Sequence, residues 1–152
     1  MVPTLPSAAT SLIGDPTASL AFTPAKLGLP YDTEGLLNAM LRGGPALAAE
    51  MFSTGHPVPA ERALQTGLLN HLVPAAELEA FTMAMARRIA ANAPLSVGSA
   101  KQQLRALAEA LALSASSMAH LHEGRRTALD SEDYAEGLAA FAAKRSPRFT
   151  GR

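Results

Sequence analysis

The chain contains no cysteine and no tryptophan, and its formal net charge is zero. Without cysteine, neither a disulfide nor a thiolate metal site can form, and this composition suits a reducing compartment. The 13 basic and 13 acidic residues cancel, so no overall basic field attracts nucleic acid or an anionic membrane surface. No apolar run approaches the roughly 20 residues of a membrane span, and residues 1–14 lack the pattern of a signal peptide. These absences favour a cytoplasmic protein that binds neither nucleic acid nor membrane.

The sequence also lacks the common motifs of metal, nucleotide and nucleophile sites. It has no HExxH, GxGxxG, Walker A or GxSxG motif. The four histidines are scattered, and His120 and His122, two residues apart, would lie on different faces of a helix. We therefore expect no metal site and no bound cofactor.

The composition is that of a globular, helix-rich domain. Hydrophobic residues make up 48% of the 152 residues and charged residues 17%, which excludes a disordered tail. Aromatic residues make up only 5%, and alanine is abundant in the second half. Because alanine forms helices well but has a small side chain, we expect these helices to need partner surfaces to complete their core.

Periodicity and turn residues predict a mainly α protein with a few short strands. Strands are expected near residues 11–13, 19–22 and 68–73, and helices over 33–42, 45–52, 59–64, 75–92, 96–113, 114–129 and from 131 to about 145. Asp32 or Thr33 can cap the first helix, and Gly67 can end the third. Acidic residues follow Ser131 at the start of the last helix, where they suit its dipole. Since so few strands are marginal in water, this sheet requires further strands.

One stretch, residues 22–31 (FTPAKLGLPY), stands out as an ordered loop. Its two prolines exclude a long helix and a central strand, so we expect an extended conformation. It presents an isolated amine at Lys26 and a phenol at Tyr31, and ordered loops of this kind often carry binding or chemistry. The alternative is a structural connector with a packed tyrosine.

Several blocks of sequence occur in the order found in one known family. They are Asp15–Phe22 (DPTASLAF), Thr54-Gly55 with Ala60–Ala63 and Gly67–Asn70, Asn92–Leu95 with Lys101, and Ser131–Pro147 (SEDYAEGLAAFAAKRSP). From about residue 12 to 151 the chain resembles the C-terminal portion of the crotonase superfamily, the enoyl-CoA hydratase/isomerase family. The resemblance implies an α/β spiral fold of the ClpP/crotonase type whose N-terminal half is missing here. Residues 1–10 would then be an unpatterned N-terminus, 11–73 a remnant of the spiral core with the active-site loop, and 74–152 a helical oligomerisation region.

Within this family the loop is most similar to that of the methylmalonyl-CoA decarboxylase group. The resemblance implies a lyase that removes CO₂ from a malonyl-type CoA thioester through an oxyanion-stabilised enolate. Tyr31 would be the catalytic residue facing the acyl carboxylate. Substrate or CoA contacts would come from Pro24, Lys26, Phe141 and Lys144. Coenzyme A would enter as part of the substrate rather than as a cofactor.

The resemblance also implies departures and leaves alternatives open. Hydratases carry a glutamate in this loop, where Pro24 or Ala25 stands here, which argues against hydration. The oxyanion-hole donors belong to the missing half, so the chain alone is expected to be an incomplete catalyst. An enoyl-CoA hydratase/isomerase-like protein, a non-catalytic CoA-binding or oligomerisation subunit and a plain helical module remain alternatives. The partners expected are an acyl-CoA thioester and copies of the chain, as a trimer or hexamer.

Overall fold

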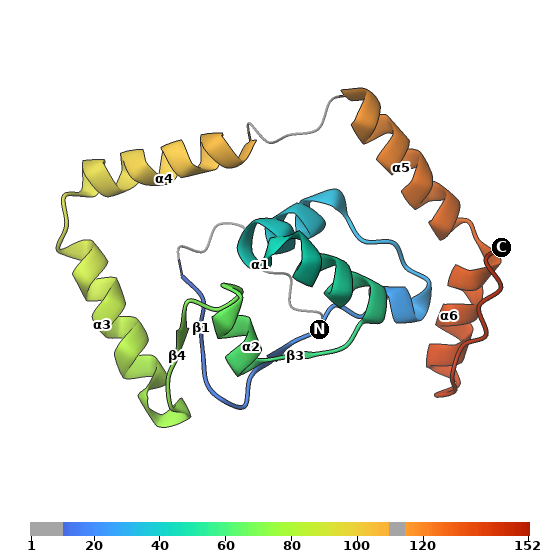
Figure 1. The fold of residues 1–152 in the computed structure, drawn as a ribbon, viewed down its shortest axis with the longest axis horizontal. Helices are drawn as coiled ribbons and strands as arrows, with labels where there is room; N and C mark the ends of the chain where they lie inside the picture. The colour runs from blue at the N-terminus through green and yellow to red at the C-terminus, as the bar shows by residue number, and fades with distance from the viewer. Residues whose placement is uncertain (1–10, 110–114) are drawn as a thin grey trace.

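The structure, a computed structural model, describes residues 11–109 and 115–152 (Figure 1). Its strands are β1 (Ile13–Gly14), β2 (Ser19–Leu20), β3 (Val58–Pro59) and β4 (His71–Leu72). Its α-helices are α1 (Thr33–Thr54), α2 (Ala60–Gln65), α3 (Leu78–Ala90), α4 (Pro94–Glu109), α5 (Ala115–Leu129) and α6 (Glu132–Ala142). Two 3₁₀ helices complete the set, η1 (Pro24–Leu27) and η2 (Ala75–Glu77). Within the described ranges, the mainly α prediction is confirmed, and no helix is long and apolar enough to cross a membrane.

The strands and the helices α1 and α2 form a central body, around which α3 to α6 run as an open arc (Figure 1). The hydrophobic core lies in this body and consists of Phe22, Leu47, Met51, Val58, Ala60, Ala63, Leu68 and Leu69. Met51 and Leu68 are its largest fully buried side chains. The arc helices present exposed apolar side chains instead, among them Leu95, Leu104 and Leu107 of α4.

Two short ladders join distant parts of the central body. Strand β1 runs parallel to β4, with Ile13 opposite His71, and β2 runs antiparallel to β3. Beyond the first ladder, the amide of Leu12 donates to Oδ1 of Asn70 at 2.8 Å, and the amide of Val73 donates to the carbonyl of Gly14 at 3.0 Å. The ladders stay short because Pro59 lacks a donor and Pro74 lies two residues after the end of β4.

The helix boundaries follow the start and stop residues predicted from the sequence. Asp32 accepts a hydrogen bond from the amide of Gly35 at 2.7 Å and begins α1, and Ser131 accepts from Tyr134 at 3.1 Å and begins α6. Gly67, with φ of 83°, follows the end of α2 as predicted. The expected break between helices 33–42 and 45–52 is a kink within α1, where Gly44 has a non-helical backbone. The Gly43-Gly44-Pro45 run therefore separates two helical segments, as predicted, and the segments stay joined at the kink.

Other expectations need correction. Residues 22–31 are not wholly extended, because Pro24 pre-sets a helical φ and Gly28, in the left-handed region, closes a single 3₁₀ turn between them. Strand β3 was not expected, since two residues carry no periodicity. The strands predicted over 11–13, 19–22 and 68–73 are shifted or shortened to β1, β2 and β4. The helix predicted over 75–92 begins with η2, and the end of the one predicted over 96–113 lies outside the described residues.

Candidate functional site

Tyr31 belongs to a cluster of three aromatic rings at the edge of the core. Its ring centroid lies 4.5 Å from that of Phe52 and 5.5 Å from that of Phe22, both edge-on. Such contacts hold a ring in place without using its polar end. The Tyr31 hydroxyl has no hydrogen-bond partner among the described residues. Burial, and to a smaller degree the charge of Asp32, raises the pKa of Tyr31 above 10, so the phenol remains a protonated donor at neutral pH.

The turn η1 places the other two loop residues of the predicted site. Pro24 is buried at its start, whereas Lys26 is exposed. The stem of Lys26 lies against the end of α1, since a Cβ on Gly55 would be 2.8 Å from its Cε atom. Lys26 and Tyr31 therefore both lie beside the last turn of α1, which carries Phe52.

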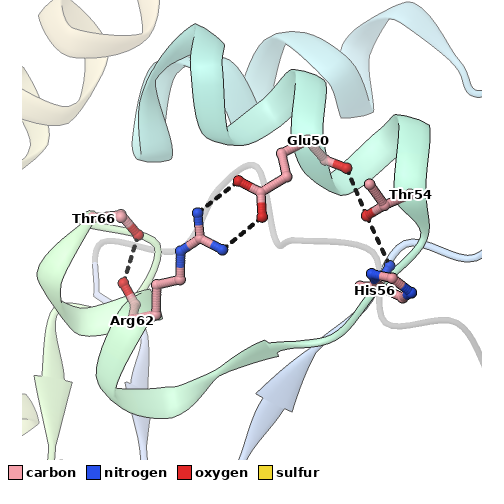
Figure 2. Close-up of polar contacts among 5 residues, drawn as sticks. All are labelled: Glu50, Thr54, His56, Arg62 and Thr66. Atoms are coloured by element: carbon pink, nitrogen blue, oxygen red, sulfur yellow. Dashed lines mark hydrogen bonds and ion pairs between the residues drawn. The ribbon is translucent and has the colours of Figure 1, made fainter.

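That last turn of α1 is tied to α2 by a polar cluster (Figure 2). The Glu50 carboxylate accepts two hydrogen bonds from the Arg62 guanidinium, at 2.7 and 2.6 Å. The pKa of Glu50 is lowered, chiefly by this contact. Thr54 donates to the carbonyl of Glu50 at 2.8 Å and accepts from the amide of His56 at 3.1 Å. The cluster thereby fixes the surface that Tyr31 and Lys26 contact.

Phe141 and Lys144 lie at the far end of α6, a helix that packs against η1. The Phe141 side chain is 71% exposed, the highest value of any described aromatic residue. Lys144 has a φ of +51°, a left-handed conformation that no other described residue except glycine adopts. Its amide donates to the carbonyl of Phe141 at 3.2 Å, and the next amide, of Arg145, donates to Ala140 at 3.0 Å. These two bonds form a Schellman motif, in which glycine is the usual residue at the position of Lys144.

The chain end folds back along α6 and is held by two carboxylates. Glu136 accepts two hydrogen bonds from Arg145, at 2.6 and 2.8 Å, and one from the amide of Arg148 at 2.8 Å. Asp133 accepts from the amides of Thr150 and Gly151, at 2.6 and 2.8 Å. The pKa of Glu136 is lowered to about 2, mainly by the hydrogen bonds from the Arg145 side chain and then by the one from the Arg148 amide. These acidic residues thus hold the tail, beyond the favourable effect on the helix dipole that the sequence predicted.

The structure brings part of the predicted site together. Tyr31, Pro24 and Lys26 share one segment, and α6, which carries Phe141 and Lys144, packs on that segment. Within the described residues no hydrogen bond or ion pair joins the two groups, and these residues contain no cluster of three or more metal-ligating side chains. Sequence reasoning missed Phe22 and Phe52 as partners of Tyr31. Its one available signal was that both are among only five phenylalanines in the chain.

Residues 4–152 match the model of a known family, described as enoyl-CoA hydratase/isomerase. This chain belongs to that family. The match confirms the resemblance drawn from the sequence blocks, and with it the crotonase-type fold. The roles of individual residues in the candidate site stay predictions.

Named relatives in the family act on CoA thioesters, according to their names. The chain is 40% identical over 140 residues to methylmalonyl-CoA decarboxylase of Escherichia coli (strain K12), covering 92% of this chain and 54% of the relative. It is 37% identical over 156 residues to carnitinyl-CoA dehydratase of Proteus mirabilis (strain HI4320), covering 95% and 56%. The chain thus spans about half the length of the curated relatives it matches.

Solved structures give the same two groups. A methylmalonyl-CoA decarboxylase in complex with 2-nitronate-propionyl-CoA superposes with a TM-score of 0.90 at 39% identity, over 95% of this chain and 55% of that one. A carnitinyl-CoA hydratase from Mycobacterium avium superposes with a TM-score of 0.78 at 30% identity, over 95% and 56%. Both scores show that the arrangement of α3 to α6 around the central body is that of the enoyl-CoA hydratase/isomerase family.

Proposed function

We propose that this chain binds acyl-CoA thioesters, and that its reaction is the loss of CO₂ from a malonyl-type thioester. The proposal is supported by family membership and by the 40% identity to a methylmalonyl-CoA decarboxylase. The observation that carries it is the Tyr31 hydroxyl, which is protonated, held by ring contacts and without a partner among the described residues.

Decarboxylation requires little acid–base chemistry. The bond between the α-carbon and the carboxylate breaks, and its electron pair forms an enolate whose oxygen needs hydrogen-bond donors. In our proposal the Tyr31 phenol donates to the departing carboxylate and holds it out of the plane of the thioester. The loop over residues 22–31 contains no carboxylate of its own. It therefore offers no general base for water, which disfavours a hydratase such as the carnitinyl-CoA relatives.

The far end of α6 is proposed to hold the CoA part of the substrate. Phe141 offers an exposed aromatic face on which an adenine ring can stack, and Lys144 offers an ammonium to phosphate. The left-handed backbone at Lys144 supports this role, because non-glycine residues in such conformations are often kept for function. Lys26, exposed at η1, is the second proposed phosphate contact, and buried Pro24 shapes the loop beneath the acyl group.

Titration of the chain with methylmalonyl-CoA and crotonyl-CoA tests the proposal. Loss of the hydroxyl in Tyr31→Phe should weaken methylmalonyl-CoA binding at least tenfold, since a hydrogen bond to a charged group contributes about 1.5–3 kcal/mol. Crotonyl-CoA, which has no free carboxylate, should bind Tyr31→Phe as it binds the wild type. Tyr134→Phe, at the only other tyrosine, is the matched control. An equal loss for both ligands would refute the role of Tyr31.

A turnover assay distinguishes a decarboxylase from a non-catalytic CoA-binding subunit. Because the chain alone is expected to be an incomplete catalyst, even slow CO₂ release from methylmalonyl-CoA, above the uncatalysed rate, supports a decarboxylase. Binding of both ligands with no release above the uncatalysed rate supports a non-catalytic CoA-binding subunit. If neither ligand binds, the proposed substrate class is wrong.

A further inference from the structure

We propose that Gly137 is a positioning residue, through which α6 sets the place of the Tyr31 loop relative to Phe141 and Lys144. The effect on acyl-CoA binding rests on the proposed function, whereas the close contact of Gly137 with Leu27 does not. A Cβ atom on Gly137 would lie 2.1 Å from the carbonyl oxygen of Leu27, 2.4 Å from its carbonyl carbon and 2.9 Å from its Cα atom. Real Cβ atoms do not approach other atoms so closely, so only glycine fits at this position.

The contact is reciprocal. Gly28, with φ of +66°, faces the first turn of α6, and a Cβ there would lie 2.8 Å from the carbonyl oxygen of Asp133 and 3.0 Å from the Cα atom of Tyr134. Backbone therefore meets backbone on both sides, at Gly137 against Leu27 and at Gly28 against Asp133. Because no side chain lies between them, no change of rotamer can absorb an added methyl group. We call these two contacts the glycine seat.

The glycines of other helices do not meet backbone in this way, since the atoms nearest a built Cβ on Gly35 and Gly43 in α1 all belong to side chains. Gly98 in α4 and Gly124 in α5 have nothing within 4 Å of a built Cβ atom. Alanine would be the better helix former at any such position. The glycine of α6 is thus explained by the seat rather than by the helix.

The seat joins the two halves of the proposed site. Tyr31 follows Gly28 by three residues, and Phe141 follows Gly137 by one helical turn. The helix end at the seat is itself anchored, because Ser131 caps it and the tail amides bind Asp133. A shift of η1 against α6 would therefore change the span between the phenol and the proposed CoA contacts.

Fluorine NMR of the chain labelled with 3-fluorotyrosine reads the seat directly. The two tyrosines give two resonances, and Tyr134→Phe assigns that of Tyr31. We expect Gly137→Ala to move the Tyr31 resonance by more than its linewidth, because the ring shifts against Phe22 and Phe52. Ala139→Gly, at an exposed site of the same helix, shows what a change in the helix propensity of α6 does without a change at the seat, and Gly98→Ala controls for the gain in helix propensity that comes with a glycine-to-alanine change. An unmoved resonance in folded Gly137→Ala, or an equal move in Ala139→Gly, overturns the proposal.

If Gly137→Ala does not fold, Gly28→Asn provides the test from the other side. Asparagine tolerates a left-handed backbone, so its effect reports the close contact rather than the φ angle. Gly151→Asn is the matched control, because Gly151 also has a positive φ but nothing within 4 Å of a built Cβ atom, and the variant keeps the amide that donates to Asp133. The Tyr31 resonance should move in Gly28→Asn only, and an unmoved resonance there would again overturn the seat.

Titration with propionyl-CoA then tests the consequence. If the seat sets the distance between Tyr31 and the proposed CoA contacts, propionyl-CoA should bind Gly137→Ala at least tenfold more weakly than the wild type. Its binding to Ala139→Gly should be unchanged. Failure of the wild type to bind propionyl-CoA would refute the proposed function while the resonance still decides the seat. Wild-type binding that survives Gly137→Ala undiminished would refute the role of the seat alone.

Discussion

The Tyr31 hydroxyl is positioned by ring packing on Phe52 and Phe22 and by the backbone of the loop. Its polar end is thus left available for a ligand. Because burial raises its pKa above 10, the donor persists through neutral and mildly alkaline pH. Activity that depends on this hydrogen bond should therefore not fall until the pH exceeds 10, unless another group titrates first.

The left-handed backbone at Lys144 can be tested for a cost in stability that is accepted in favour of acyl-CoA binding. A left-handed conformation costs a non-glycine residue about 1–2 kcal/mol, so Lys144→Gly should raise the free energy of unfolding by about 1 kcal/mol in denaturant titrations. The same variant should weaken acyl-CoA binding, because it removes the ammonium. Lys144→Ala keeps the strain and loses the charge, so it should weaken binding without adding stability. A Lys144→Gly variant that is no more stable than Lys144→Ala would contradict the strain.

Among the elements, the helix ends could be predicted from the sequence, whereas the pairing of the short strands could not. Asp32, Ser131 and Gly67 act within a few residues of themselves, so their local sequence predicts where α1 and α6 begin and α2 ends. The pairing of β2 with β3 depends on contacts across about 40 residues, which periodicity cannot report. The same limit applies to the site, where Tyr31 was evident but its neighbour Phe52, on another element, was not.

The hydrogen bonds by which Glu136 holds Arg145 and the amide of Arg148, here called the tail clamp, predict a pH dependence. The folded-state pKa of Glu136, about 2, lies below its ordinary value of 4.5, so this group stabilises the fold at any pH well above 4.5. That contribution should be lost as the pH falls from about 4.5 through 2. Melting temperatures measured between pH 6 and pH 2 should therefore fall less steeply in Glu136→Gln than in the wild type. Glu132→Gln, at an exposed site one turn earlier on α6, is the control. Parallel curves for the wild type and Glu136→Gln would exclude the clamp.

At the scale of the molecule, α4 stands out because its leucines are exposed. Leu95 is 88% exposed, Leu104 68% and Leu107 67%, and Figure 1 shows α4 held away from the central body. Burying one such side chain contributes about 1.5–3 kcal/mol. We propose that a second copy of the chain covers the face of α4 that carries Leu104 and Leu107, in line with the oligomer expected from the sequence.

Light scattering after size exclusion measures the association. We expect the wild type to self-associate and the double variant Leu104→Glu/Leu107→Glu to lose at least a hundredfold in affinity, since two buried leucines become charged. Gln102→Glu adds charge on the face of α4 opposite Leu104 and Leu107 and should leave the oligomer intact. A monomeric wild type at all concentrations would rule out a second copy as the partner.

The parallel pairing of β1 with β4 has a kinetic consequence. It joins Leu12 to Asn70, 58 positions apart, and closing a loop of that length costs about 3.6 kcal/mol of chain entropy beyond a constant term. The ladder should therefore form late, after α1 and α2 have packed. Amide hydrogen exchange of Asn70 and Val73 should then show one shared opening rate, faster than that of the amides in the second half of α1. Each opening would free both ends of the segment between β1 and β4 at once, and this segment contains Tyr31.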